Sequence, residues 1–257
     1  MIRISKLFYS PVKSLSFESV FSCSIQKKIG IVNDRLIAFS RNVDFETAKL
    51  IEKEPKSRNH HKFLSLKNTI ALNKYQFSFI GKNLILKLKN KEILSIEIDD
   101  EKQRTHMCNK LVEIESSIKG PIFLLQNNSF PFFDTTHSNN IHNTISLINL
   151  NSINDLSSKI NNNIEYERFR GNIYIDGIDA WEERNWINKT ITINGVSFRV
   201  EMHIPRCSAT NLKPKTDIET INLPLAIKEK YNHSDMGVYL KAFDKGVINI
   251  NDQIKIL

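Results

Sequence analysis

Cysteine is scarce in this sequence. Only three cysteines, Cys23, Cys108 and Cys207, occur among 257 residues, and long stretches of chain separate them. Because no two of them are close in sequence, the chain has neither a disulfide framework nor a paired-cysteine metal motif. Three thiolates are also too few for an all-cysteine iron–sulfur cluster held by one chain. This usage fits a reducing compartment, so we expect a cytoplasmic protein.

Long apolar runs are missing as well. No stretch approaches the length of about 18 uninterrupted apolar residues that is typical of a transmembrane helix. Residues 1–7 carry no signal-peptide core, and residues 2–9 instead alternate as a strand does, with a shift that indicates a bulge. The sequence therefore predicts no transmembrane segment and no secretory leader.

Basic residues exceed acidic ones, but they are not concentrated. Lysine and arginine number 36 against 28 acidic residues, which gives a net charge of +8. The lysines are scattered and often alternate with apolar residues, as in residues 86–89 (LKLK), without a basic arm or an aromatic-laced cluster. We therefore expect no nucleic-acid partner. A basic nucleic-acid-binding β protein stays open as an alternative, although the same charge also favours anionic small ligands.

Short strands and tight turns make up most of what is present. Residues 75–80, 84–88 and 93–98 form a predicted meander, and residues 194–195 (NG) predict a type I′ hairpin turn. Residues 17–25 indicate one further strand. The pattern favours a barrel or sandwich over a doubly wound sheet, so we expect a fold that is mainly β with a few helices (α+β).

Helical periodicity is limited to a few segments. Met107, Leu111 and Ile114 recur at helical spacing, which predicts a helix within residues 99–118. Shorter helices are expected over residues 45–53, from a Ser152 cap to about residue 160, and from an Asn222 cap to residue 231. Residues 127–143 form a long polar segment, and loops of that size are often functional.

The stretch from Arg168 to Cys207 holds the candidate chemistry. Arg168, Arg170 and Asn172 open one predicted strand, and Arg206 and Cys207 follow a second strand that ends at proline. Guanidinium and amide donors suit phosphate or carboxylate oxygens, and a thiol beside an arginine is a candidate thiolate ligand for a soft metal. The alternative is that the arginines are solvated surface residues and that the cysteine is a small buried hydrophobic side chain. The pattern indicates a pocket for an anionic cofactor that carries a soft metal.

Several segments, taken together, resemble the MOSC family. This family is similar to the C-terminal domain of molybdenum-cofactor sulfurase, and a β-barrel N-terminal domain often precedes it. The segments, in chain order, are residues 9–14 (YSPVKS), 30–39 (GIVNDRLIAF), 145–149 (ISLIN), 168–173 (RFRGNI), 180–186 (AWEERNW), 205–210 (PRCSAT), 233–240 and 246–252. The chain departs from the family pattern at Gly171, where proline is frequent, and at Asn251, where glycine is frequent.

The resemblance implies a smaller β-rich domain over residues 1–115 and a barrel-like MOSC domain over residues 116–257. It implies molybdenum cofactor (Mo-molybdopterin), with Cys207 as the molybdenum ligand and the catalytic residue. The positions that match the cofactor-binding motifs, or that flank the cysteine, are Lys13, Ser14, Arg35, Thr136, Ser138, Arg168, Arg170, Asn172, Arg206 and Thr210.

The reductase branch of this family suggests an activity. The resemblance implies an oxidoreductase that reduces N-hydroxylated or related N-oxygenated small molecules at a cysteine-ligated molybdenum. Since no ferredoxin-like domain and no membrane anchor are evident in the sequence, we expect electrons to come from a separate protein. The alternative is a module that carries the cofactor, or a sulfur on Cys207, without turnover.

Overall fold

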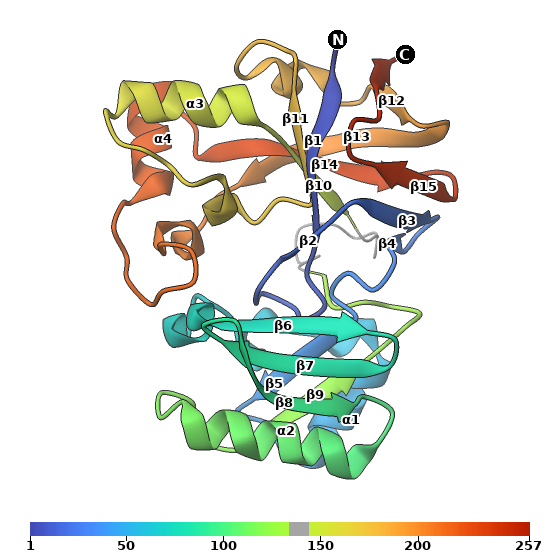
Figure 1. The fold of residues 1–257 in the computed structure, drawn as a ribbon, viewed down its shortest axis with the longest axis vertical. Helices are drawn as coiled ribbons and strands as arrows, with labels where there is room; N and C mark the ends of the chain where they lie inside the picture. The colour runs from blue at the N-terminus through green and yellow to red at the C-terminus, as the bar shows by residue number, and fades with distance from the viewer. Residues whose placement is uncertain (134–143) are drawn as a thin grey trace.

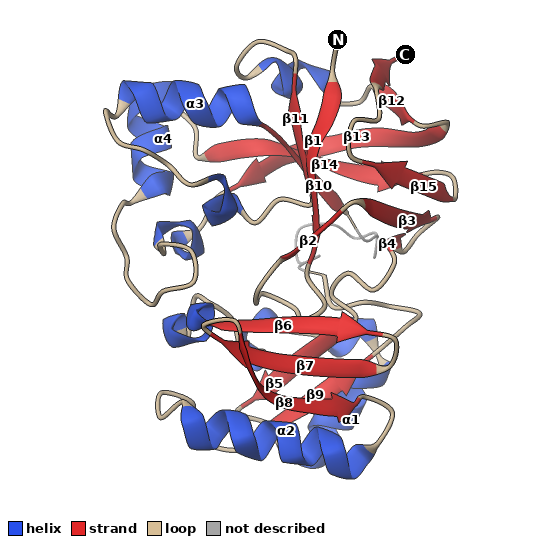
Figure 2. Ribbon diagram, in the orientation of Figure 1, coloured by secondary structure: helices blue, strands red, loops and turns tan. Residues whose placement is uncertain are grey.

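The computed structural model describes residues 1–133 and 144–257, and strands predominate there. The predicted class, mainly β with a few helices, is confirmed (Figure 2). Among the helices that the structure describes, none combines the length and the apolar character that a bilayer crossing requires. The α-helices are α1 (Phe45–Lys53), α2 (Glu101–Ile114), α3 (Leu150–Lys159) and α4 (Leu223–Tyr231), and the 3-10 helices are η1 (Pro55–Ser57), η2 (His60–Lys62), η3 (Ile70–Lys74), η4 (Tyr166–Phe169), η5 (Glu182–Trp186) and η6 (Ser208–Asn211).

The largest sheet combines the beginning and the end of the chain (Figure 1). Its strand order is β16-β12-β13-β14-β10-β11-β1-β2. β1 runs antiparallel to β11, and a register shift between Ile4 and Lys6 confirms the predicted bulge. The strands are β1 (Arg3–Tyr9), β2 (Glu18–Val20), β10 (Ile145–Asn149), β11 (Ile173–Asp176), β12 (Thr190–Ile193), β13 (Val196–Pro205), β14 (Asp235–Ala242) and β16 (Ile254–Ile256).

A second group of elements, residues 37–126, lies below this sheet in Figure 1 and is called the first unit. It contains α1, α2, the pair β5-β9 and the predicted meander β6-β7-β8, which is confirmed. A further three-stranded sheet, β15-β3-β4, flanks the large one. Its strands and those of the first unit are β3 (Ser22–Gln26), β4 (Gly30–Ile31), β5 (Ile37–Arg41), β6 (Tyr75–Ile80), β7 (Asn83–Leu88), β8 (Lys91–Glu97), β9 (Ile122–Gln126) and β15 (Gly246–Asn249).

Strand pairing crosses the boundary expected at residues 115 and 116. β1, from the start of the chain, pairs with β11, and β9, from beyond residue 116, pairs with β5. The two-domain division and the barrel-like closure of the large sheet therefore stay predictions. The pairing explains why residues from both ends of the chain meet at one place.

Three local expectations needed correction. The strand expected over residues 17–25 is two strands, because β2 pairs with β1 whereas β3 pairs with β15 in another sheet. Helix α2 is shorter than residues 99–118, since Asp100 accepts hydrogen bonds from the first free N–H groups and Glu115 ends the helix. Helix α3 begins at Leu150, and the side chain of Asn149 caps it rather than that of Ser152.

The hairpin between β12 and β13 follows the predicted turn chemistry. Asn194 and Gly195 both have a positive φ, 47° and 76°, as a type I′ turn requires. The turn sets a register in which Ile193 pairs with Val196, and both side chains are buried. The hairpin thereby orients β13, which ends at Pro205, two residues before the candidate cysteine.

Candidate functional site

Asn172 joins three segments of the candidate site. It is fully buried, and its Oδ1 accepts hydrogen bonds from the N–H of Ser146 at 3.1 Å and from the Ser146 hydroxyl at 2.8 Å. Its Nδ2 donates to the carbonyl of Phe8 and to Oδ2 of Asp34, each at 3.2 Å. The amide thus connects β10, the end of β1 and the turn before β5. A cofactor contact from Asn172 stays a prediction.

A buried ion pair lies next to this amide. Asp34 is fully buried, accepts from the N–H of Ser10 at 2.7 Å and pairs with the guanidinium of Arg35. Burial raises the pKa of Asp34, while the Arg35 charge and the hydrogen bonds from Ser10 and Asn172 act in the opposite direction. The ion pair with Asp34 holds the Arg35 guanidinium in place.

Arg170 and Arg35 share one aromatic ring. Their Cζ atoms lie 4.9 Å and 5.1 Å from the ring centroid of Phe17. Arg170 donates to the carbonyl of Leu15, and among the described residues no carboxylate lies within ion-pair distance of it. Burial, together with the nearby charge of Arg35, lowers the pKa of Arg170 to about 10. Two neighbouring guanidinium groups in a partly buried place favour an anion between them.

The backbone is strained at three of the predicted binding residues. Ser14, Arg35 and Arg170 have φ values of 60°, 54° and 53°, in the left-handed region. Asparagine, which tolerates this region, occupies most of the other left-handed positions outside glycine. Such strain costs on the order of 1–3 kcal/mol per residue and gathers at functional sites. The shared conformation supports a common task for these three residues.

Lys13 is only 5% exposed, so it is not a solvated turn lysine. Its backbone N–H donates to the carbonyl of Ile37 at 2.7 Å, which fixes the segment after β1 against β5. Its Nζ lies 5.5 Å from the ring centroid of Phe63. A buried lysine on a fixed backbone is a suitable point charge for an anionic group.

The three cysteines differ in accessibility. Cys23 and Cys108 are buried, and burial raises the pKa of both thiols to about 12. Cys207 is partly exposed and lies close enough to Arg170 and Arg206 to act on both electrostatically. Because a thiolate must be accessible to bind a metal, Cys207 is the candidate ligand among the three.

Residues 134–255 match the MOSC domain family. This matched range is called the MOSC domain below. Curated relatives include the mitochondrial amidoxime reducing component 2 of Macaca fascicularis, 28% identical over 115 residues, which is 40% of this chain and 34% of that protein. The same component of Rattus norvegicus is 32% identical over 37% of this chain and 27% of that protein. The alignments thus span about a third of these relatives.

A further relative and one solved structure complete the comparison. Human mitochondrial amidoxime-reducing component 1 is 26% identical over 41% of this chain and 34% of that protein. The crystal structure of the YuaD protein from Bacillus subtilis covers 100% of this chain and 96% of its own, with a TM-score of 0.46 and 10% identity.

The MOSC domain supplies only part of the candidate site. Arg170 and Cys207 lie within the matched range, whereas Lys13, Ser14 and Arg35 come from the segment before it. Thr136 and Ser138 lie outside the described residues. Phe17, which sequence reasoning missed, is the ring that the two arginines share, and its only sequence signal is its position just after the residues 9–14 motif.

Arg168 directs its donors to the protein. It is buried, and its guanidinium bonds to a Glu165 carboxylate at 2.6 Å, to the carbonyl of Asn211 at 2.9 Å and to the Thr220 hydroxyl at 2.7 Å. Asn211 ends the η6 turn that begins directly after Cys207. The geometry makes Arg168 a support for this turn, and a direct bond to a cofactor stays a prediction.

Arg206 and Thr210 also bond to backbone carbonyls around the cysteine. Arg206 donates to Phe169 at 2.8 Å and to Met236 at 2.9 Å. The Thr210 hydroxyl donates to the carbonyl of Cys207 itself at 2.8 Å. Both were predicted as cofactor-binding residues, and the observed bonds give them a role in holding the cysteine turn.

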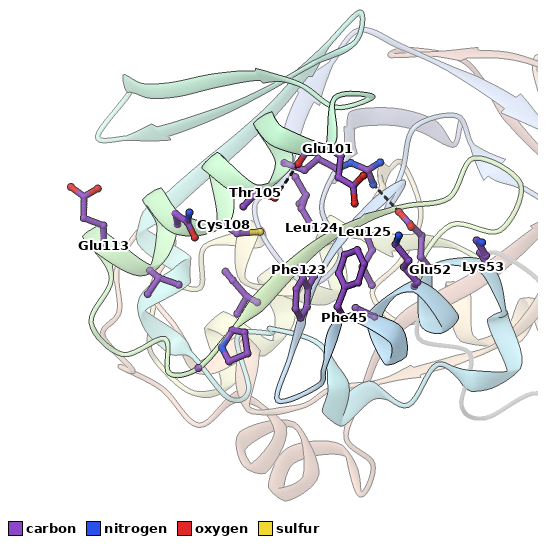
Figure 3. Close-up of a pocket in the computed structure, with 18 residues that line it drawn as sticks. Phe45, Glu52, Lys53, Glu101, Thr105, Cys108, Glu113, Phe123, Leu124 and Leu125 are labelled. Atoms are coloured by element: carbon purple, nitrogen blue, oxygen red, sulfur yellow. Dashed lines mark hydrogen bonds and ion pairs between the residues drawn. The ribbon is translucent and has the colours of Figure 1, made fainter.

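The larger of two cavities in the described structure lies away from this site. A cavity of about 760 Å³ lies in the first unit between α1, α2 and β9, with Phe45, Cys108 and Phe123 in its lining (Figure 3). None of the described candidate residues lines it. A smaller cavity of about 110 Å³ borders Arg170 and Phe17. Cys207 does not line this smaller cavity, so the candidate site is defined by its charged side chains and its thiol rather than by either cavity.

Proposed function

We propose that this chain binds molybdenum cofactor and reduces N-hydroxylated or related N-oxygenated small molecules at a molybdenum held by Cys207. The MOSC match and the amidoxime-reducing relatives support a role associated with this cofactor. The observation that carries the proposal is the partly exposed Cys207 thiol beside Arg170, in a chain whose other two thiols are buried.

The residues present fit the cofactor's chemistry. Arg35 and Arg170 share the Phe17 ring, and Lys13 adds a buried cation, a donor set that suits a phosphate. A cysteine thiolate is a soft ligand of the kind that suits the metal. When bound, the cofactor supplies a two-electron oxygen-atom transfer. In this assignment Arg35 and Arg170 bind the phosphate, and Cys207 orients the metal.

The charged side chains at the site favour an anionic ligand. Arg35 is paired with Asp34, whereas no carboxylate of the described residues lies within ion-pair distance of the Arg170 guanidinium. Anion binding there relieves the repulsion between the two arginines. We further propose that the reducing equivalents come from a separate electron-donor protein.

Metal analysis tests the proposal. Full-length protein expressed in a host that makes the cofactor is expected to contain about one molybdenum and one pterin per chain. Cys207→Ala is expected to lose the molybdenum, because the protein ligand is gone, whereas Cys23→Ala, at a buried thiol, keeps it. The wild type is expected to turn over an amidoxime with a chemical reductant. A folded wild type that never takes up molybdenum contradicts the proposal.

The partial exposure of Cys207 also suits a second function, that of a carrier. In that case the chain stores or delivers the cofactor, or a sulfur bound to Cys207, without reducing a substrate. Mass spectrometry distinguishes the two: a persulfide on Cys207 without amidoxime turnover supports the carrier. Turnover by the molybdenum-loaded protein supports the reductase.

A further inference from the structure

The segment that follows Cys207 leaves the MOSC sheet and packs on the first unit. Leu212 is 2% exposed and belongs to the same core cluster as Leu72 and Phe77, which are first-unit residues. Ala209, inside the η6 turn, packs against that cluster. The turn that carries the candidate thiol therefore has the MOSC domain on one side and the first unit on the other.

One first-unit side chain bonds twice to this segment. Asn73, in η3, donates through Nδ2 to the carbonyl of Lys213 at 2.9 Å and to that of Thr216 at 2.6 Å. Its neighbour Lys74 forms an ion pair with Asp217 at 3.1 Å. Because Lys213 and Asp217 are otherwise exposed, these polar bonds are what attach the segment to the first unit beyond Leu212.

Arg206 holds the other side of the cysteine. Its backbone N–H donates to the carbonyl of Ser234 at 2.9 Å. Its guanidinium reaches the carbonyl of Met236, in β14, at 2.9 Å and that of Phe169, in η4, at 2.8 Å. All of these acceptors are main-chain oxygens, so Arg206 connects the chain before Cys207 to two fixed elements of the MOSC domain.

We propose that Asn73 and Arg206 are positioning residues for Cys207, and that the first unit thereby helps to set where the thiol lies. The inference depends on the proposed function in one respect only, namely that the Cys207 thiol serves as a metal ligand. The position of the thiol itself is a property of the folded chain. It is set by bonds that converge from both sides on the segment around residue 207.

The effect of removing the Asn73 bonds is expected to be local. Asn73→Asp keeps the size of the side chain but replaces the donor by an oxygen that repels the Lys213 and Thr216 carbonyls. The η6 turn keeps its bonds from Arg168 and Thr210, so the fold is retained while the segment opens more often. The thiol is then reached more easily by a reagent.

Alkylation kinetics test the proposal on full-length protein from a host that cannot make the cofactor. Iodoacetamide labelling of each cysteine is followed by mass spectrometry at fixed pH. Asn73→Asp is expected to label Cys207 at least about fivefold faster, since a single hydrogen bond of ordinary net strength corresponds to that factor and the substitution removes two. Asn109→Asp, an exposed change on α2 of the same unit, is the matched control and keeps the parental rate.

Arg206 is tested in the same assay. Arg206→Gln is expected to raise the rate of Cys207 labelling by at least as much as Asn73→Asp does. Arg206→Lys is expected to raise it less than Arg206→Gln, since the lysine ammonium group still donates hydrogen bonds. Cys23 and Cys108 report general unfolding, because both are buried. A Cys207 rate that is unchanged or slower in Asn73→Asp, or an equal rise at all three thiols, overturns the proposal.

The assay also separates the two proposals. If the wild type takes up no molybdenum but the Asn73→Asp rate rises at Cys207 alone, the positioning inference holds and the proposed function fails. If the wild type binds molybdenum but the Cys207 labelling rates of the parent and Asn73→Asp do not differ, the proposed function holds and the positioning inference fails. Where both hold, Asn73→Asp is expected to lower the molybdenum content per chain while Asn109→Asp does not.

Discussion

Polar side chains with no access to water carry much of the site's order at the residue scale. Asn172 is fully buried, and both ends of its amide are bonded to groups from separate segments. A buried polar group is tolerated only when its hydrogen bonds are made, so the surrounding segments have to meet at a defined geometry. The amide thus contributes to the site by fixing the Asp34 carboxylate that in turn holds Arg35.

Asn172→Ala is expected to reduce the free energy of unfolding by about 3 kcal/mol, because partners such as the Ser146 N–H and the Phe8 carbonyl lose a buried bond and each such loss costs roughly 1–3 kcal/mol. Urea unfolding at neutral pH measures the change. Asn109→Ala, at an exposed position, serves as control and is expected to stay within about 0.5 kcal/mol of the parent. An equally small change in Asn172→Ala contradicts the role assigned to the amide.

At the element scale, the start of α3 is tied to η5 by a buried carboxylate. Glu183 is fully buried, and its oxygens accept from the Ser152 hydroxyl at 2.9 Å and from the Asn149 amide at 3.1 Å. This explains why Ser152 does not cap the helix as its sequence position suggested: its hydroxyl is already bonded to Glu183, and Asn149 takes the capping position. Residues of η5 thereby orient α3 on the large sheet.

The ionisation of Glu183 should make stability depend on pH. Burial raises its pKa above the ordinary carboxyl value, so the folded chain holds the proton more tightly than the unfolded chain. The contribution of protonated Glu183 to the free energy of unfolding is complete at pH values below the ordinary carboxyl pKa. It is lost as the pH rises toward the pKa of Glu183 in the folded chain. Glu183→Gln cannot ionise, so its stability relative to the parent is expected to grow across that interval, by up to about 1.4 kcal/mol per pH unit.

Urea unfolding of parent and Glu183→Gln between about pH 4 and pH 7 measures that difference. Because Asp34 is present in both proteins, its own pH dependence cancels. Glu92→Gln, at an exposed carboxylate in β8, is the matched variant and is expected to follow the parent. A difference between parent and Glu183→Gln that stays constant over this range contradicts the assignment.

On the scale of the whole molecule, the chain's two groups of elements are joined by side chains that cross between them. Leu212, from the MOSC domain, is buried in the first-unit core, and Ser16 accepts from the N–H of Phe77 at 2.7 Å. The Tyr9 hydroxyl donates to the carbonyl of Phe79 at 3.2 Å, next to the site segment. These contacts keep the residues of both groups in one arrangement around the candidate site.

Leu212→Ala is expected to lower the free energy of unfolding by about 3 kcal/mol, since a buried leucine leaves a cavity that the surroundings fill only in part. Leu225→Ala, in α4, is the control because that side chain is 49% exposed. Chemical denaturation of both variants measures the difference. Equal stabilities in the two variants count against Leu212 as a joint between the groups.

Local patterns in the sequence were sufficient for most elements. Alternation and turn residues predicted the meander and the hairpin, because hydrophobic period and turn chemistry act over a few neighbouring residues. The errors occurred where a distant partner intervened: the strand at residues 17–25 divides between two sheets, and Ser152 bonds to Glu183 rather than to its own helix. A local pattern holds no information about such partners.

The site shows the same division. The motif residues Lys13, Arg35, Arg170 and Cys207 were predicted from the sequence, and the structure places Arg35 and Cys207 each within electrostatic reach of Arg170. The shared Phe17 ring and the Asn73 bonds were not found, since nothing near either residue in the chain marks it. The bonds of Arg168, Arg206 and Thr210 to carbonyls became visible only in three dimensions.

By itself, the sequence determined the class of the fold, the family of the second half and the residue types available for binding an anion and a metal. These depend on composition, period and motif, which are properties of neighbouring residues. Only the tertiary structure decided which thiol is accessible, which arginines lie together and which ones support the cysteine turn. Burial and hydrogen bonding between distant segments decide those questions, because they arise only when the chain has folded.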